Sequence, residues 1–120
     1  MAINSRDKGA RYERKVAELF REHGYEAERG CQHSGGKDSP DVKHNALRLH
    51  IEAKNVERLN IWKALEQSKK DAGAEEIPIV VFKKNRSKTY VALPFEEFME
   101  LYQAWEREQK EKINGENQNT

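Results

Sequence analysis

The sequence predicts a mixed α/β domain, in which helices flank a central mixed five-stranded sheet in the order αβββαββα. Residues 47–54 alternate apolar and polar side chains, which is the period of a half-buried strand. Residues 78–82 are continuously apolar and have the length of a strand buried on both faces. Three further segments carry apolar residues at helical spacing, so helices and strands are expected to share one core.

The first half of the chain predicts one helix and three strands. The helix is expected over residues 6–23 and the first strand over residues 25–29. A loop rich in glycine and serine leads to a short segment at Asp41. A turn at Asn45 is expected to pair this segment antiparallel with residues 47–54.

The second half predicts a helix, a hairpin and a final helix. The helix is expected over residues 61–72 and precedes the buried apolar strand. Residues 83–88 form a basic turn, after which residues 89–93 return as the second strand of the hairpin. The last helix begins at Pro94, and its apolar stripe either covers the sheet or mediates self-association.

Composition bounds the class of protein. The 120 residues suffice for a single domain, expected over 1–110, with 111–120 as a polar tail that frays. The net charge is only +1, but residues 29–93 hold 13 Lys/Arg against 8 Asp/Glu, a balance that attracts polyanions. The single cysteine excludes an intrachain disulfide and a cysteine-based zinc site. No membrane-spanning stretch or signal peptide is visible, so a soluble cytoplasmic protein without a membrane partner is expected.

The candidate site lies between Asp41 and Lys54. Glu52 and Lys54 follow each other on the polar side of the predicted strand, about 7 Å apart, and the expected turn brings Asp41 close to them. Two carboxylates that share a hard cation such as Mg²⁺, with an ammonium beside them, indicate phosphodiester hydrolysis. The carbonyl of Ala53 is a candidate third ligand. Lys54 acts either as a base toward the attacking water or as an electrostatic partner of the phosphate.

Three features admit a structural interpretation beside the functional one. Glu13 lies at the edge of the first helix's apolar stripe, and periodicity alone favours an ordinary helix glutamate paired with a neighbouring cation. Ser34 lies in a loop that is either a plain connection or a contact for phosphate. The basic turn at residues 83–88 either holds a backbone phosphate or keeps an edge of the sheet soluble.

These motifs resemble the PD-(D/E)XK nuclease superfamily and, within it, the archaeal-type Holliday junction resolvases. The resemblance runs from about Gly9 to Phe82. It rests on Pro40-Asp41, Glu52-Ala53-Lys54, the segment from Gly9 to Arg14, Arg29, Ser34-Gly35 and Glu66-Gln67. It implies a restriction-endonuclease-like fold, a Mg²⁺ cofactor for which Mn²⁺ can substitute, and a homodimer that cuts branched double-stranded DNA.

The resemblance also implies roles for individual residues. The catalytic residues are Glu13, Ser34, Asp41, Glu52, Lys54 and Gln67. The acidic metal ligands are Glu13, Asp41 and Glu52, and the carbonyl of Ala53 joins them as the ligand expected from the strand itself. DNA contacts are expected from Lys8, Arg11, Arg29, Lys37, Lys83, Lys84, Arg86 and Lys88.

The leading hypothesis is a Mg²⁺-dependent, structure-selective DNA endonuclease that resolves four-way junctions. The first alternative is another nuclease of the same superfamily, of the restriction or repair type, that cuts other branched or linear DNA. The second is a DNA-binding module without catalysis, and the intact Asp41, Glu52 and Lys54 argue against it.

Overall fold

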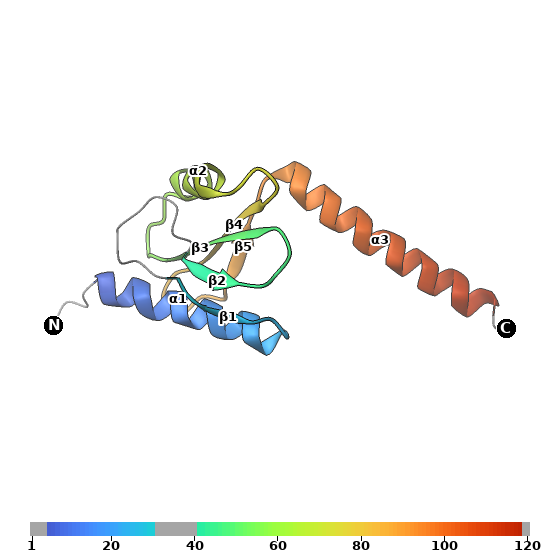
Figure 1. Ribbon diagram of the computed structural model, residues 1–120, viewed down its shortest axis with the longest axis horizontal. Coiled ribbons are helices and arrows are strands. Elements are labelled where there is room, and N and C mark those ends of the chain that lie inside the picture. The colour runs from blue at the N-terminus through green and yellow to red at the C-terminus, as the bar shows by residue number, and fades with distance from the viewer. Residues whose placement is uncertain (1–4, 31–40, 119–120) are drawn as a thin grey trace.

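The computed structural model describes residues 5–30 and 41–118, which form three helices and five strands in the predicted order (Figure 1). The helices are α1 (Ser5–Glu22), α2 (Ile61–Asp71) and α3 (Phe95–Gln118). The strands are β1 (Ala27–Arg29), β2 (Val42–His44), β3 (Leu49–Asn55), β4 (Ile77–Lys83) and β5 (Tyr90–Ala92). Among the described residues, no helix has the length and apolar character that crossing a membrane requires.

The strands form two small sheets, so the predicted five-stranded central sheet is wrong. β1 pairs antiparallel with β2, while β3, β4 and β5 form a separate sheet in that order. β3 and β4 are parallel, and β4 and β5 are antiparallel. The expected antiparallel pairing across Asn45 is therefore wrong: β2 pairs with β1, and no ladder joins β2 to β3 among the described strands. At the free edge of β3, the Asp41 carboxylate accepts a hydrogen bond from the Ala53 N–H at 2.8 Å, so a side chain stands where a neighbouring strand would pair.

β3 differs from its prediction at its start and in its burial. It begins at Leu49 instead of Leu47, because Arg48 has a φ of 54° in a turn, and Leu47 is 86% exposed. Both faces of the strand are covered, since Ile51 is 0% exposed on one face and Glu52 is 1% exposed on the other. The polar residues of β3 thus lie in the interior and not on a half-solvated face.

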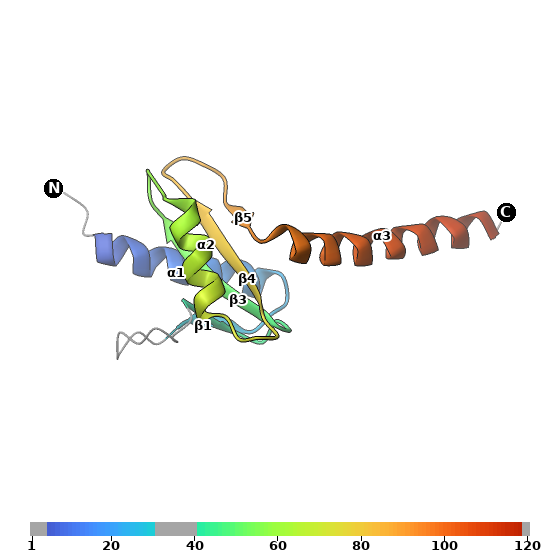
Figure 2. The same ribbon diagram turned by 90° about the horizontal axis from the view of Figure 1, so that it is seen from above.

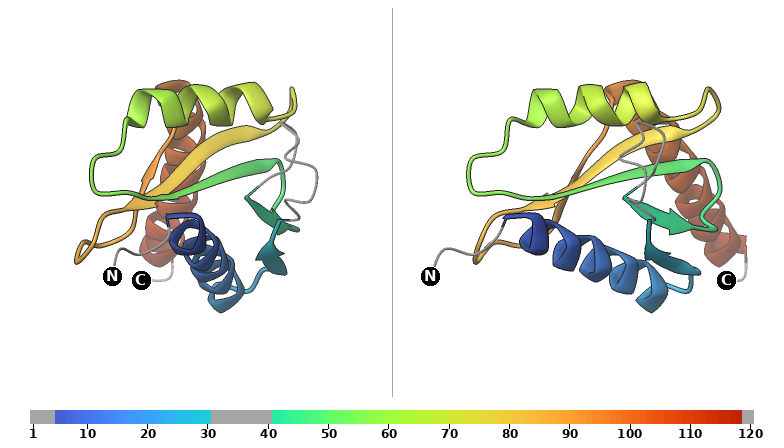
Figure 3. Two further views of the ribbon diagram at one scale, coloured as in Figure 1. Left: turned by 90° about the vertical axis from the view of Figure 1, so that its left-hand side faces the viewer. Right: turned by 60° about the vertical axis from the view of Figure 1, so that its left-hand side comes forward.

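The two shorter helices lie on opposite sides of the β3–β4 pair (Figure 3). α2 connects these parallel strands as a crossover and is fixed to β4 by the Ser68 hydroxyl, which donates to the Ile79 carbonyl at 3.0 Å. α1 covers the face that carries Ile51. The core cluster on that side comprises Tyr12, Val16, Ala17, Val42, Ile51, Ala53, Ile79 and Val81.

α3 extends away from the rest of the domain, which gives the chain a longest dimension of 64 Å (Figures 1 and 2). It does not cover the sheet, and its aromatic side chains are exposed, including Phe95 at 69% and Trp105 at 54%. The helix continues through residues 111–118, which the sequence assigns to a fraying polar tail. The ion pairs Glu106–Lys110 and Glu108–Lys112, each with i,i+4 spacing, support this extension.

Candidate active site

Asp41 is positioned from two sides between β1 and β3. Its carbonyl accepts a hydrogen bond from the Gly30 N–H at 2.9 Å, and its side chain accepts one from the Ala53 N–H at 2.8 Å. The next residue, Val42, is fully buried in the core and fixes the start of β2. Asp41 therefore has a defined place beside β3 although its own segment does not pair with that strand.

Glu52 is the most buried acidic side chain in the described part of the protein, with 1% of its surface exposed. Its Oε1 lies 3.2 Å from Nε2 of His50, two residues earlier on the same face of β3. Its Oε2 is buried without a hydrogen bond of ordinary geometry to any described residue, although the Asp41 carboxyl lies beside it. A buried oxygen without a donor is costly, so this position calls for a proton or a cation.

The protonation of the pair reflects this crowding. Burial, followed by the negative charge of Glu52, raises the pKa of Asp41 to about 7. Burial also acts to raise the pKa of Glu52, but the hydrogen bonds from His50 and Asp41 and the nearby Lys54 ammonium outweigh it, so this pKa lies below its ordinary value. Below neutral pH the pair thus keeps one proton on Asp41 and a negative charge on Glu52, and around pH 7 Asp41 begins to lose that proton.

Glu13 and Lys54 complete the acidic and basic groups that face this pair. Glu13 is mostly buried on α1, and its charge contributes to the raised pKa of Asp41, which places it near the pair. Its partner is Arg29 on β1, whose Nε donates to Oε2 at 2.7 Å, and not a neighbour on the same helix. Lys54 is half-buried on β3. Arg29, which the sequence predicts as a DNA contact, is therefore held against an acidic site residue.

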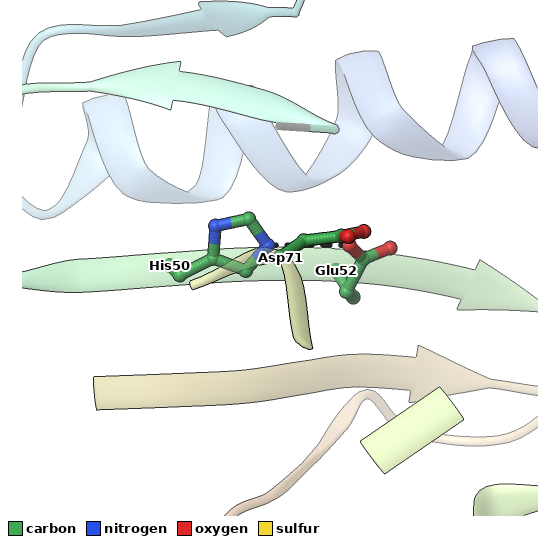
Figure 4. A group of neighbouring side chains, drawn as sticks. All are labelled: His50, Glu52 and Asp71. Atoms are coloured by element: carbon green, nitrogen blue, oxygen red, sulfur yellow. Dashed lines mark hydrogen bonds and ion pairs between the residues drawn. The ribbon is translucent and has the colours of Figure 1, made fainter. Parts of the chain in front are cut away.

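His50, Glu52 and Asp71 form a second group that the sequence alone did not reveal (Figure 4). One potential ligand atom from each lies within 4.8 Å of the others. The pKa of His50 is raised, mainly by its hydrogen bond to Glu52 and against the effect of burial. The two-residue spacing of His50 and Glu52 signals a shared face of β3, but Asp71 is the last residue of α2 and arrives only because the crossover helix runs back along the strands.

The donor set suits a divalent cation. Carboxylate oxygens from Asp41 and Glu52 are ligands that Mg²⁺ and Mn²⁺ accept, and the imidazole of His50 is a nitrogen donor better suited to Mn²⁺ than to Mg²⁺. A cation beside Glu52 Oε2 would satisfy the buried oxygen and offset the charge repulsion that, after burial, raises the pKa of Asp41. A cavity of 290 Å³ lined in part by His50 and Asp71 adjoins this cluster.

The other residues that the sequence predicts for the site do not all lie near Asp41 and Glu52. Ser34 and Lys37 lie outside the described residues. Gln67 is exposed on α2, next to the buried Ser68. The Ala53 side chain is in the core, as expected, while its N–H contacts Asp41.

Among the predicted DNA contacts, three line one pocket, namely Lys8, Arg11 and Lys83. The other three in the β4–β5 turn are exposed, namely Lys84, Arg86 and Lys88.

Comparison with known proteins places the chain in a family. No curated protein and no solved structure matches the chain. A family model described as "Phage putative PDDEXK endonuclease" matches residues 4–119. The match spans nearly the whole chain, and the chain therefore belongs to this phage endonuclease family of the PD-(D/E)XK superfamily.

Proposed function

We propose that this family member is a Mg²⁺-dependent DNA endonuclease that cuts four-way junctions. The observation that carries the catalytic part is that the half-buried Asp41, held by the Ala53 N–H at 2.8 Å, lies near the buried carboxyl of Glu52. Glu13 and Lys54 lie close enough for their charges to act on this pair. Asp41, Glu52 and the Ala53 carbonyl would hold the cation. The Ala53 N–H points to Asp41, and in a strand the carbonyl of the same residue points to the same side, which leaves it free of the β4 ladder.

The protein groups divide the work around the phosphodiester. A bound divalent cation supplies charge neutralisation at the phosphate and makes a coordinated water more acidic. The Ala53 N–H holds the Asp41 carboxylate at the edge of β3, and His50 holds one oxygen of Glu52. The Lys54 ammonium stands next to Glu52, where it would orient the attacking water or offset the charge that builds on phosphorus.

Two copies of the chain are needed to cut opposing strands of a junction, and α3 offers the surface for their association. Phe95, Phe98, Tyr102 and Trp105 recur at spacings of three and four residues, which is the pattern of a helix that pairs with a like helix. Their exposed fractions run from 42% to 69%, and the Tyr102 ring lies 5.7 Å from that of Trp105. This continuous aromatic stripe supports a homodimer.

The reaction is tested by incubating the protein with a synthetic four-way junction and with a linear duplex of the same sequence, each with Mg²⁺, Mn²⁺ or EDTA. We expect paired, symmetric cuts in the junction, only with a divalent ion. Equal cleavage rates on the junction and on the linear duplex would contradict the resolvase and favour a nuclease of the restriction or repair type. Junction binding without cleavage in any metal would leave a non-catalytic binding module.

The dimer surface is tested by introducing charge into the aromatic stripe. Trp105→Glu places a carboxylate where the second helix would pack, so the variant is expected to elute and scatter light as a monomer, whereas the unchanged chain has twice that mass. Ala104→Glu adds the same charge on the side of α3 that faces away from the aromatic stripe, and it serves as the control. If the unchanged chain is monomeric at micromolar concentration, the proposal that α3 forms a dimer surface is wrong.

A further inference from the structure

We propose that a basic pocket between α1 and the ends of β3 and β4 binds a backbone phosphate close to the one that is cut. The inference rests on the proposed function, because it takes the ligand to be the substrate strand. The pocket has a volume of 340 Å³. It is lined by Lys8, Arg11, Tyr12, Lys15, Asn55, Lys83 and Asn85.

The charge of this pocket selects an anion. Every charged side chain that lines it is basic, and the cations come from separate elements. Lys8, Arg11 and Lys15 occupy one face of α1, at spacings of three and four residues, while Lys83 ends β4. Convergence from two elements differs from a run of lysines along one solvated helix, because the tertiary fold holds like charges together at a cost that an anion would offset.

Two residues that line the pocket carry buried polar atoms without a hydrogen-bond partner among the described residues. The Tyr12 side chain is 4% exposed, and its hydroxyl has no hydrogen bond of ordinary geometry among the described residues, although Thr89 lies near enough to influence its pKa. Asn55 Oδ1 is likewise buried, with no hydrogen-bond partner in the described part of the chain. A phosphate oxygen would accept from the Tyr12 hydroxyl, and rotation of the Asn55 amide would present its NH₂ group to the same anion.

The position of the pocket relates it to the cleavage site. Asn55 follows Lys54 directly and lies three residues beyond Glu52, about 10 Å along β3. Asn55 and Lys83 are register partners at the carboxyl ends of parallel strands, a place where phosphate ligands commonly bind in α/β folds. With an axial rise of ~3.4 Å per nucleotide in duplex DNA, this distance corresponds to a phosphate within about three nucleotides of the cut.

The test measures DNA binding in EDTA, where cleavage does not interfere. The affinity of the protein for a fluorescent four-way junction is measured by anisotropy at salt concentrations from about 50 to about 200 mM. The unchanged chain is compared with the double variant Lys8→Gln/Lys83→Gln. The double variant is expected to reduce the slope of log K against log[salt] by nearly two, because two phosphate contacts are lost. Arg107→Gln/Lys110→Gln on α3 removes the same charge far from the pocket and is expected to leave the slope unchanged.

A second variant distinguishes phosphate binding in the pocket from the general attraction of a basic surface for DNA. Tyr12→Phe keeps the ring in the core and removes only the hydroxyl, so affinity should fall about tenfold with no change in salt slope. Equal slopes for the pocket and α3 variants, or full affinity in Tyr12→Phe, would overturn the pocket. Loss of cleavage in all metals with these binding results intact would overturn the endonuclease while the phosphate site stands.

Discussion

Asp41→Asn is expected to lower cleavage by on the order of 10³-fold or more while making the metal-free protein more stable. The amide oxygen still accepts the Ala53 N–H, but the amide group is a poor substitute for a carboxylate as a cation ligand. At the same time its NH₂ group can donate to Glu52 Oε2, which has no hydrogen bond of ordinary geometry among the described residues, and one like charge disappears. We expect about 1–2 kcal/mol of added stability, measured by urea unfolding in EDTA.

The same variant should change how stability depends on pH. Asp41 keeps its proton up to about pH 7 in the folded chain, whereas the unfolded chain releases it near 3.8. The folded state therefore binds more protons between these values, and its stability is lost as pH rises through that window, by at most about 1.4 kcal/mol per pH unit. Asp41→Asn should flatten the profile between about pH 4 and 7. An asparagine variant that is less stable than the unchanged chain at pH 8 would show that the two carboxyls do not repel each other in the folded state.

Lys54→Met is expected to reduce single-turnover cleavage by roughly 10²–10⁴-fold without weakening metal binding. The methionine side chain has a similar length and no charge, so the group that faces the phosphate is lost while the carboxylates remain. Because the Lys54 ammonium helps to keep the pKa of Glu52 low by its positive charge, it also repels a nearby cation. Mn²⁺ should therefore bind Lys54→Met at least as tightly, as measured by calorimetry.

Lys54→Arg distinguishes the two roles of the lysine. Arginine keeps the charge but does not release its proton near neutral pH. Partial activity would identify Lys54 as an electrostatic partner, and activity as low as that of the methionine variant would identify it as a base. Full activity in Lys54→Met would remove the residue from the catalytic group.

Much of the candidate site was predictable because it lies in one short stretch. Glu52 and Lys54 share a face through the two-residue period of a strand, and Ala53 accordingly points into the core. The order of the elements followed from periodicity. By contrast, the Glu13–Arg29 pair joins residues on α1 and β1, and no local pattern indicates such a contact. Glu13 entered the prediction only through resemblance.

Contacts made by the crossover and by the sheet edge could not be foreseen. Asp71 lies near His50 because of the direction in which α2 returns, which is a property of the βαβ connection and not of the residues in α2. The predicted pairing of β2 with β3 is wrong, since β2 pairs with β1 and the Asp41 side chain occupies the edge of β3. Three-residue strands carry too weak a pattern to decide between partners. The helix beyond residue 110 was not expected because its residues are polar, and the ion pairs of Glu106 with Lys110 and of Glu108 with Lys112 support it only as far as Lys112.

The Asp41 carboxylate accepts the Ala53 N–H that a further strand would need for pairing. A strand added at this edge of β3 and the proposed role of Asp41 therefore exclude each other. An engineer who extended β2 to dock along β3 would gain ladder hydrogen bonds and close an exposed edge, which ordinarily improves solubility. The same change would displace the Asp41 carboxylate from the Ala53 N–H and place a strand along the edge of β3 that carries Glu52. Redesign for thermal robustness should therefore begin at β5 or α2 and leave this gap open.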